Sequence, residues 1–95
     1  MTTTARGDSR ATPWGRAALL DDVTIPQRAG EKRFATIVEL LETERGERLV
    51  RFAYSTGNVA RRGPVTLRAR DLERLRSALR NHPALAVALA LGGEA

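Results

Sequence analysis

Two strand-like runs on either side of a polar turn constrain the fold of this chain most. The first run covers residues 34–41 (FATIVELL), the second covers residues 49–55 (LVRFAYS), and Gly46 lies between them. The first run also has an apolar side when it is drawn as a helix. The immediate return into a second run rich in β-branched and aromatic residues favours two strands. The sequence therefore predicts a β-hairpin.

The residues after the hairpin predict short extended segments and then a helix. Residues 59–60 and 65–67 have the composition of short strands, and Pro64 is tolerated at the start of the second. Residues 68–81 carry an apolar stripe at helical spacing. Three leucines form this stripe, which we expect to pack on the sheet or against a second subunit: Leu72, Leu75 and Leu79. Residues 84–91 (ALAVALAL) predict a short apolar helix that is buried against something.

The first part of the chain shows no sustained hydrophobic period. Glycine, proline, serine and threonine are scattered through residues 1–30, and we expect this segment to be flexible. A chain of 95 residues leaves no room for a second core. The sequence thus predicts one α+β domain over residues 31–95, an antiparallel sheet of three to four strands followed by a C-terminal helix. Because so small a domain lacks cysteine, we expect self-association as a dimer to stabilise it.

Positive charge is concentrated in one segment. Of the 16 basic residues, 15 are arginine, which is typical of a GC-rich bacterial genome. Codon bias acts evenly along a chain, yet residues 45–80 hold ten basic and three acidic residues, whereas residues 1–44 hold six and seven. A basic segment in an otherwise neutral chain indicates a polyanionic partner.

Most catalytic classes lack their residues here. The chain has no cysteine and one histidine, His82, and contains neither a phosphate-binding glycine motif nor a metal-ligand cluster. We therefore expect no enzymatic activity, no cofactor, no metal and no small-molecule substrate. No apolar run approaches the roughly 18–20 residues of a membrane span, and no signal peptide is recognisable, so we expect a cytoplasmic protein without a membrane partner.

Arginines and an aromatic residue of the basic segment suggest a surface for single-stranded nucleic acid. Such surfaces combine cations for the phosphates with aromatic faces for the bases. We expect six residues to take these roles: Arg48, Arg51, Tyr54, Arg61, Arg62 and Arg68. Phe34 and Phe52 are expected in the core instead.

The order of these elements resembles the positive cofactor four family of transcriptional coactivators, over about residues 34–80. Members have a hairpin-rich antiparallel sheet followed by a helix. Their motif is a basic-basic-glycine step, a short apolar strand and the start of the helix. Five residues fall in order on it: Gly63, Thr66, Leu67, Leu72 and Leu75. A shorter loop after Tyr54 and the additional Pro64 depart from the family's pattern.

The resemblance implies a homodimer formed through the C-terminal helices, with single-stranded DNA lying across the sheet and its basic loops. Arg51 and Tyr54 would take the arginine and aromatic positions of the second strand, and Arg61 and Arg62 the basic step. The leading hypothesis is a single-stranded DNA-binding protein that regulates transcription, at the nucleoid of a bacterial cell. RNA as the ligand, a protein–protein interaction module with a basic surface, and a binder of double-stranded DNA or RNA are the alternatives.

Overall fold

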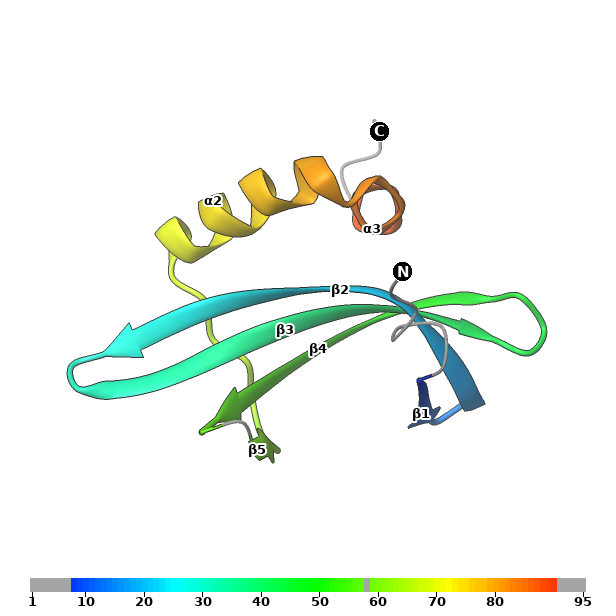
Figure 1. Cartoon of the computed structure of the whole chain (residues 1–95), viewed down its shortest axis with the longest axis horizontal. Helices are drawn as coiled ribbons and strands as arrows, with labels where there is room; N and C mark the ends of the chain where they lie inside the picture. The colour runs from blue at the N-terminus through cyan, green and yellow to red at the C-terminus, as the bar shows by residue number, and fades with distance from the viewer. Residues whose placement is uncertain (1–7, 58, 91–95) are drawn as a thin grey trace.

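The computed structural model of the protein describes residues 8–57 and 59–90. These residues form one five-stranded antiparallel sheet in which each strand pairs with the next one along the chain. Two helices and a 3-10 turn cover one face of this sheet (Figure 1). The elements are β1 (Ser9–Thr12), β2 (Gly15–Ala29), β3 (Lys32–Thr43), β4 (Arg48–Thr56), β5 (Val59–Arg61), α2 (Ala69–Ala78), η1 (Leu79–Asn81) and α3 (Pro83–Ala88).

The predicted α+β fold is confirmed, and the predicted hairpin is β3 with β4. These strands pair from Ala35 opposite Ser55 to Glu42 opposite Arg48. Gly46 turns the chain between them with a φ of 89°, a conformation that residues with a Cβ rarely adopt. The sheet has five strands rather than three to four, because two of them come from the N-terminal part of the chain.

The expectation of a flexible N-terminal segment is wrong for residues 9–29, which form β1 and β2 and belong to the same sheet. Residues 1–7 lie outside the described residues. Every second residue of β2 from Ala17 to Gln27 is buried or partly buried, which is the alternation of a strand. The two aspartates and Pro26 hide this period in the sequence. Pro26 is tolerated because this half of β2 pairs with β3 alone.

A β-bulge allows β2 to contribute buried apolar residues to both faces of the sheet. Leu19 pairs with Leu41 and Asp21 with Leu40, so Leu20 is an extra residue without a partner in the ladder. The bulge inverts the alternation and bends the strand. Residues on the two sides of Leu20 therefore enter different apolar clusters, although all of them have odd numbers.

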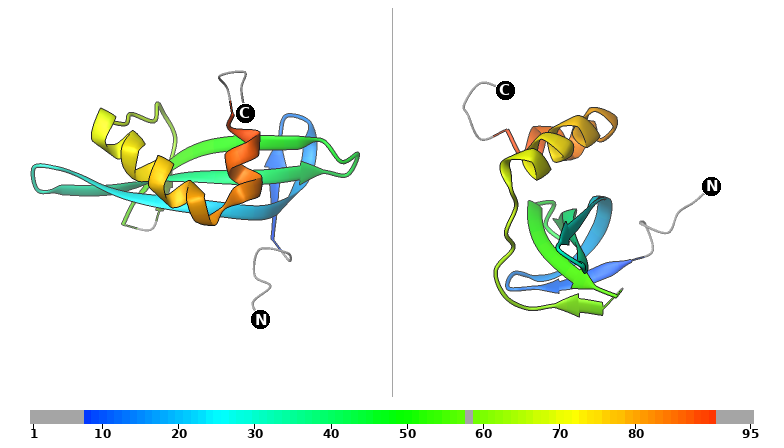
Figure 2. Two further views of the ribbon diagram at one scale, coloured as in Figure 1. Left: turned by 90° about the horizontal axis from the view of Figure 1, so that it is seen from above. Right: turned by 90° about the vertical axis from the view of Figure 1, so that its left-hand side faces the viewer.

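The larger cluster lies between the sheet and the helices. It joins Val23 and Ile25 of β2 and Val38 and Leu40 of β3 to the two helical leucines, Leu75 and Leu85. The smaller cluster, Ala17, Leu19 and Leu41, lies on the opposite face. We call the two faces the helix-covered face and the open face. The edge strands β1 and β5 both curl away from the helices, so the open face is concave (Figures 1 and 2).

The C-terminal region differs from the prediction in detail. Residues 69–81 are helical, divided into α2 and η1, and Arg68 is the extended N-cap of α2. Residues 65–67 form no strand and belong to a linker between β5 and α2. α3 ends at Ala88, and residue 91 lies outside the described part. Of the predicted stripe, Leu75 is buried and Leu79 packs against the core, but Leu72 is half exposed.

Candidate nucleic-acid interface

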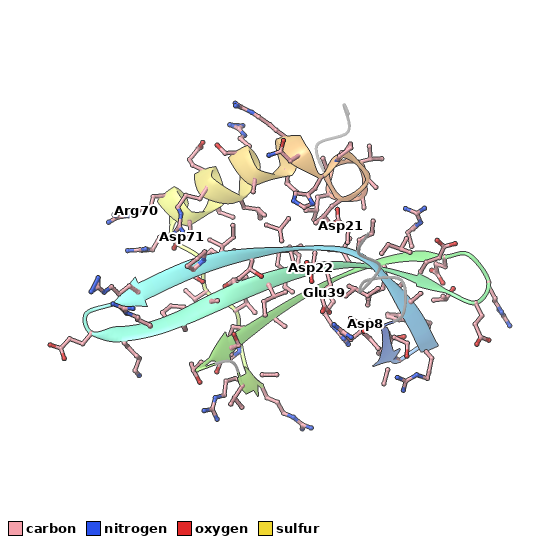
Figure 3. All side chains as sticks on the ribbon, in the orientation of Figure 1. Asp8, Asp21, Asp22, Glu39, Arg70 and Asp71 are labelled. Carbon is pink, nitrogen blue, oxygen red and sulfur yellow. The ribbon has the colours of Figure 1, made fainter. Side chains whose placement is uncertain are left out.

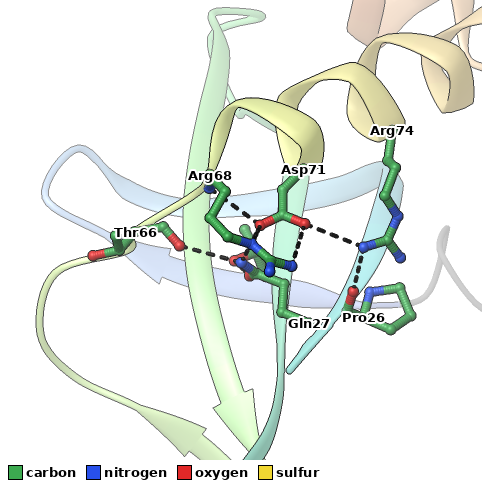
Figure 4. A network of polar contacts seen from close by, with 7 residues as sticks. Pro26, Gln27, Thr66, Arg68, Asp71 and Arg74 are labelled. Atoms are coloured by element: carbon green, nitrogen blue, oxygen red, sulfur yellow. Dashed lines mark hydrogen bonds and ion pairs between the residues drawn. The ribbon is translucent and has the colours of Figure 1, made fainter. Parts of the chain in front are cut away.

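A buried polar network fixes the start of α2 on the sheet (Figure 4). The side-chain amide of Gln27 in β2 donates to the carboxylate of Asp71 over 3.0 Å and to the backbone carbonyl of Thr66 over 3.3 Å. The hydroxyl of Thr36 in β3 donates to the amide oxygen of Gln27. Gln27, Thr36 and Asp71 are all buried. Because each of these polar atoms has a partner, the network holds the linker and α2 against two strands.

The Asp71 carboxylate is the centre of this network. Arg68 approaches it with Nε at 2.9 Å and Nη2 at 3.1 Å, and Arg74 with Nη1 at 3.2 Å. The backbone N–H of Arg68 donates to the same carboxylate over 3.1 Å. These hydrogen bonds, those from Arg68 foremost, hold the pKa of Asp71 well below its usual range, although burial acts in the opposite direction. Arg68, which we expected at a phosphate, therefore has a structural role at Asp71.

Two more of the expected phosphate contacts pair with carboxylates. Arg51 in β4 lies 3.1 Å from Glu39, which also binds Arg10 of β1 at 3.1 Å. Arg51 additionally donates to the backbone carbonyl of Ala11 over 3.0 Å and so joins β4 to β1 across the open face. Arg48 lies 3.3 Å from Glu42, its cross-strand neighbour. An approaching phosphate would have to compete with these carboxylates.

Arg61 and Arg62 have no acidic partner within 4 Å in the described part of the chain. Both are exposed, Arg61 at the end of β5 and Arg62 directly after it. The Nε of Arg61 donates to the hydroxyl of Thr56 over 2.6 Å, which orients the guanidinium without neutralising it. Of the expected cationic contacts, these two are the ones whose charge is available.

A groove of about 520 Å³ opens beside Arg61 on the helix-covered face, beyond the end of the core. Phe34 of β3 and Tyr54 of β4 provide its aromatic surface, and among the described residues no acidic side chain lines it. The other lining residues are basic, hydroxyl-bearing or proline: Lys32, Arg33, Thr36, Thr56, Arg61, Pro64 and Thr66. We call this the aromatic groove.

Tyr54 is held in place by the linker that follows β5. Its hydroxyl donates to the backbone carbonyl of Arg62 over 3.2 Å. Gly63 lies next to it with a φ of 123°, and a Cβ at Gly63 would lie 3.7 Å from the tyrosine oxygen. The linker can follow this path because glycine adopts that φ without strain. The ring therefore has a fixed position at the side of the groove.

The sequence alone did not reveal three basic residues of this region, Arg28, Lys32 and Arg33. They lie at the tip of the β2–β3 hairpin, where Arg28 stands directly opposite Arg33. The hairpin brings them to the same half of the molecule as the start of α2 and the linker (Figures 1 and 3). In Figure 3 Arg70 lies at this end, whereas Asp8, Asp21, Asp22 and Glu39 lie in the centre or beyond it. The alternation of buried residues in β2 is the sequence signal that could have revealed them, because it would have predicted the β2–β3 hairpin.

Two aromatic residues expected in the core have other positions. Phe34 is half-buried in the aromatic groove, and Phe52 is 42% exposed on the helix-covered face. Phe52 pairs with the buried Val38 and so lies on the helix-covered face, but neither α2 nor α3 covers it completely. The prediction that Phe52 belongs to the core is wrong.

Comparison with known proteins identifies no relative of this chain. A scan against protein-family models and searches of curated proteins and of solved structures found no match. Among the described residues no helix is long and apolar enough to cross a membrane. Nor do residues 8–57 and 59–90 contain a group of three or more potential metal ligands.

Replacing Asp71 with asparagine tests the network. The lowered pKa means that ionised Asp71 stabilises the fold above the ordinary aspartate pKa of about 3.9, and that this contribution is lost as the pH falls below it. We expect Asp71→Asn to lower the urea midpoint at pH 7 markedly and to reduce the difference between the midpoints at pH 7 and pH 3. Glu73→Gln on the same helix, whose partner Arg76 lies 3.9 Å away at the surface, is the control. Equal midpoints for the two variants at pH 7 would contradict this role.

Proposed function

We propose that the protein binds single-stranded nucleic acid in the aromatic groove. The observation that carries the proposal is the combination, in one groove, of two aromatic side chains with unneutralised cations and no carboxylate. Aromatic faces stack on bases of any sequence, and cations follow the phosphate backbone. DNA is the nucleic acid that we propose, in agreement with the resemblance drawn from the sequence, and regulation of transcription in the bacterial cytoplasm is the process.

The arrangement of the helices favours a single strand over a duplex. A helix that reads duplex DNA has to enter the major groove with a free face. α2 and α3 instead lie on the sheet, with Leu75 and Leu85 buried beneath them. A stacking surface at the level of the sheet can be reached only by bases that are not paired.

The contacts that we propose differ in part from those expected from the sequence. Arg61, Arg62 and Tyr54 remain, and Lys32 and Arg33 join them. Arg48 and Arg51 are left out because their guanidinium groups are bound to carboxylates, and Arg68 is left out because it does not line the groove. Four cations around the groove would neutralise up to four phosphates, and each phosphate contributes about 0.7 to the salt dependence for a single strand.

The double substitution of Arg61 and Arg62 with alanine tests the cationic part of the site. We expect it to weaken binding of a single-stranded oligonucleotide on the order of tenfold and to lower the slope of log K against log salt by about 1.4. Fluorescence anisotropy over a salt series measures both. Arg45→Ala with Arg80→Ala removes the same charge from two exposed arginines outside the groove and is the matched control.

Three results would separate the possibilities. Tight, salt-sensitive binding that favours a single strand over its duplex supports the proposal. Equal losses in the two double variants would mean that net charge, not the groove, determines affinity. If wild-type protein fails to bind either form at low salt, the proposed function is wrong.

The aromatic part of the groove has its own control within the same hairpin. Phe34 lines the groove, whereas Phe52 is exposed on the same face outside it. We expect Phe34→Ala to weaken single-strand binding by about 1–3 kcal/mol, the contribution of one stacked base, and Phe52→Ala to leave it unchanged. Quenching of intrinsic fluorescence on titration with oligonucleotide measures the affinities. A loss of affinity in Phe52→Ala but not in Phe34→Ala would mean that the bases bind outside the aromatic groove.

An apolar surface on the helices supports the proposal of a homodimer. Leu72 of α2 is 50% exposed and Val87 of α3 is 74% exposed. Both residues belong to the helices, where a second subunit could cover them, as apolar association surfaces require. This surface, rather than the aromatic groove, is where an interaction with another polypeptide would occur.

Substitution of Val87 tests this homodimer. We expect Val87→Glu to change the mass measured by light scattering from that of a dimer to that of a monomer, with an unchanged circular dichroism spectrum, because the side chain contributes little to the core. Thr24→Glu, at an exposed position of β2, should remain dimeric. A wild-type protein that is monomeric at high concentration would contradict the homodimer but not the nucleic-acid site.

A further inference from the structure

Four arginine side chains surround a second hollow, where the tip of the β2–β3 hairpin approaches α2. Arg28 and Arg33 come from the hairpin, Arg68 precedes α2 and Arg74 lies within it. The hollow has a volume of about 290 Å³, and no carboxylate of residues 8–57 and 59–90 lines it. This is room for a phosphate group with several waters, since one water occupies about 30 Å³ in the liquid.

Two of these arginines are oriented before any ligand arrives. Asp71 holds both Arg68 and Arg74, and the Nη1 of Arg74 also donates to the backbone carbonyl of Pro26 over 2.7 Å (Figure 4). Nearly half of each side chain nevertheless remains exposed. A guanidinium has five N–H donors, and Asp71 and Pro26 use only some of them. The remaining donors are available to an anion without the cost of ordering two flexible side chains.

The other two arginines form a pair that folding alone does not favour. Arg28 and Arg33 stand directly opposite each other in the antiparallel ladder, and like charges at such positions destabilise a sheet. Neither has an acidic partner within 4 Å in the described residues. With Asp71 as the one carboxylate in contact with the four guanidiniums, the cluster has an excess of three positive charges. An anion between the hairpin and the helix would remove this repulsion.

We propose that the hollow between the β2–β3 hairpin tip and α2 is a binding site for a phosphate group, formed by Arg28, Arg33, Arg68 and Arg74. Guanidinium groups bind phosphate oxygens through pairs of charge-assisted hydrogen bonds. The phosphate has two possible sources, a phosphodiester of a strand bound in the aromatic groove or a free phosphorylated molecule. Arg33 lines both the hollow and the groove, so one strand can reach both. Only the first source rests on the proposed function.

The test uses pyrophosphate as the free ligand and an oligonucleotide as the polymer. Calorimetric titration measures pyrophosphate binding to the full chain, and anisotropy over a salt series measures the oligonucleotide. Arg28→Gln removes one charge at an exposed strand position outside the Asp71 network. If the phosphate belongs to a free molecule, we expect Arg28→Gln to weaken pyrophosphate binding roughly tenfold. If it belongs to a bound strand, we expect Arg28→Gln to lower the slope of log K against log salt for the oligonucleotide by about 0.7. Arg28→Lys should restore the slope, and Arg80→Gln, which removes the same charge elsewhere, should change neither quantity.

The outcomes of these titrations show whether the phosphate belongs to a free molecule or to a bound strand, or that the hollow binds no phosphate. A loss of pyrophosphate affinity with an unchanged oligonucleotide slope assigns the site to a free phosphorylated molecule. A reduced slope without pyrophosphate binding assigns it to the polymer. If pyrophosphate does not bind and Arg28→Gln has the same slope as wild type, the hollow is not a phosphate site. Oligonucleotide binding that persists in that case leaves the proposed function intact.

Discussion

The buried carboxylate of Asp71 is the contact on which the C-terminal half of this structure depends. It receives hydrogen bonds from Gln27 on the sheet and from Arg68 and Arg74 on the helical side. A buried carboxylate without these donors would be strongly destabilising, because its desolvation would not be compensated. The linker between β5 and α2 must therefore pass close to the end of β2. That path places Gly63 and Arg62 over Tyr54 and forms one side of the aromatic groove.

The same carboxylate decides which cations remain available. A count of charges along the sequence gives every arginine the same weight. In the structure, however, Arg68 and Arg74 both pair with Asp71, and Arg10 and Arg51 both pair with Glu39. The pairs with Glu39 join strands that are distant along the chain, β1 and β4 to β3, whereas Arg68 and Arg74 each lie three residues from Asp71. Arg61 and Arg62 follow a stretch without acids and find no such partner. The two buried acids thus determine which arginines have a structural role, and only Arg68 and Arg74 combine that role with a place at the proposed phosphate site.

The sequence predicted those strands and helices whose hydrophobic pattern can be recognised within the segment itself. The β3–β4 hairpin follows from two apolar runs around Gly46, and α2 from leucines at helical spacing. β2 was missed because its period-2 pattern is interrupted by the aspartates near Leu20 and by Pro26, features that usually mark a turn. The bulge at Leu20 depends on pairing with β3, and no local rule specifies it. The exposed positions of Leu72 and Phe52 depend on where the helices cross the sheet, which the stripe itself does not determine. The fold class was predictable from patterns, whereas the basic residues at the hairpin tip required β2 to be recognised first.

The unequal distribution of paired and unpaired charge has a kinetic consequence. Arg28, Lys32 and Arg33 belong to the tip of the β2–β3 hairpin, and Arg61 and Arg62 to the end of β5 and the residue after it. Asp8, Asp21 and Asp22 lie in the centre of the molecule or toward the end away from this tip (Figure 3). These five cations attract a polyanion before contact is made, which favours encounters at the groove. Encounters would then be productive more often than random collision allows. Added salt would shorten the range of this attraction, and its effect would appear in the association rate before it appears in the lifetime of the complex.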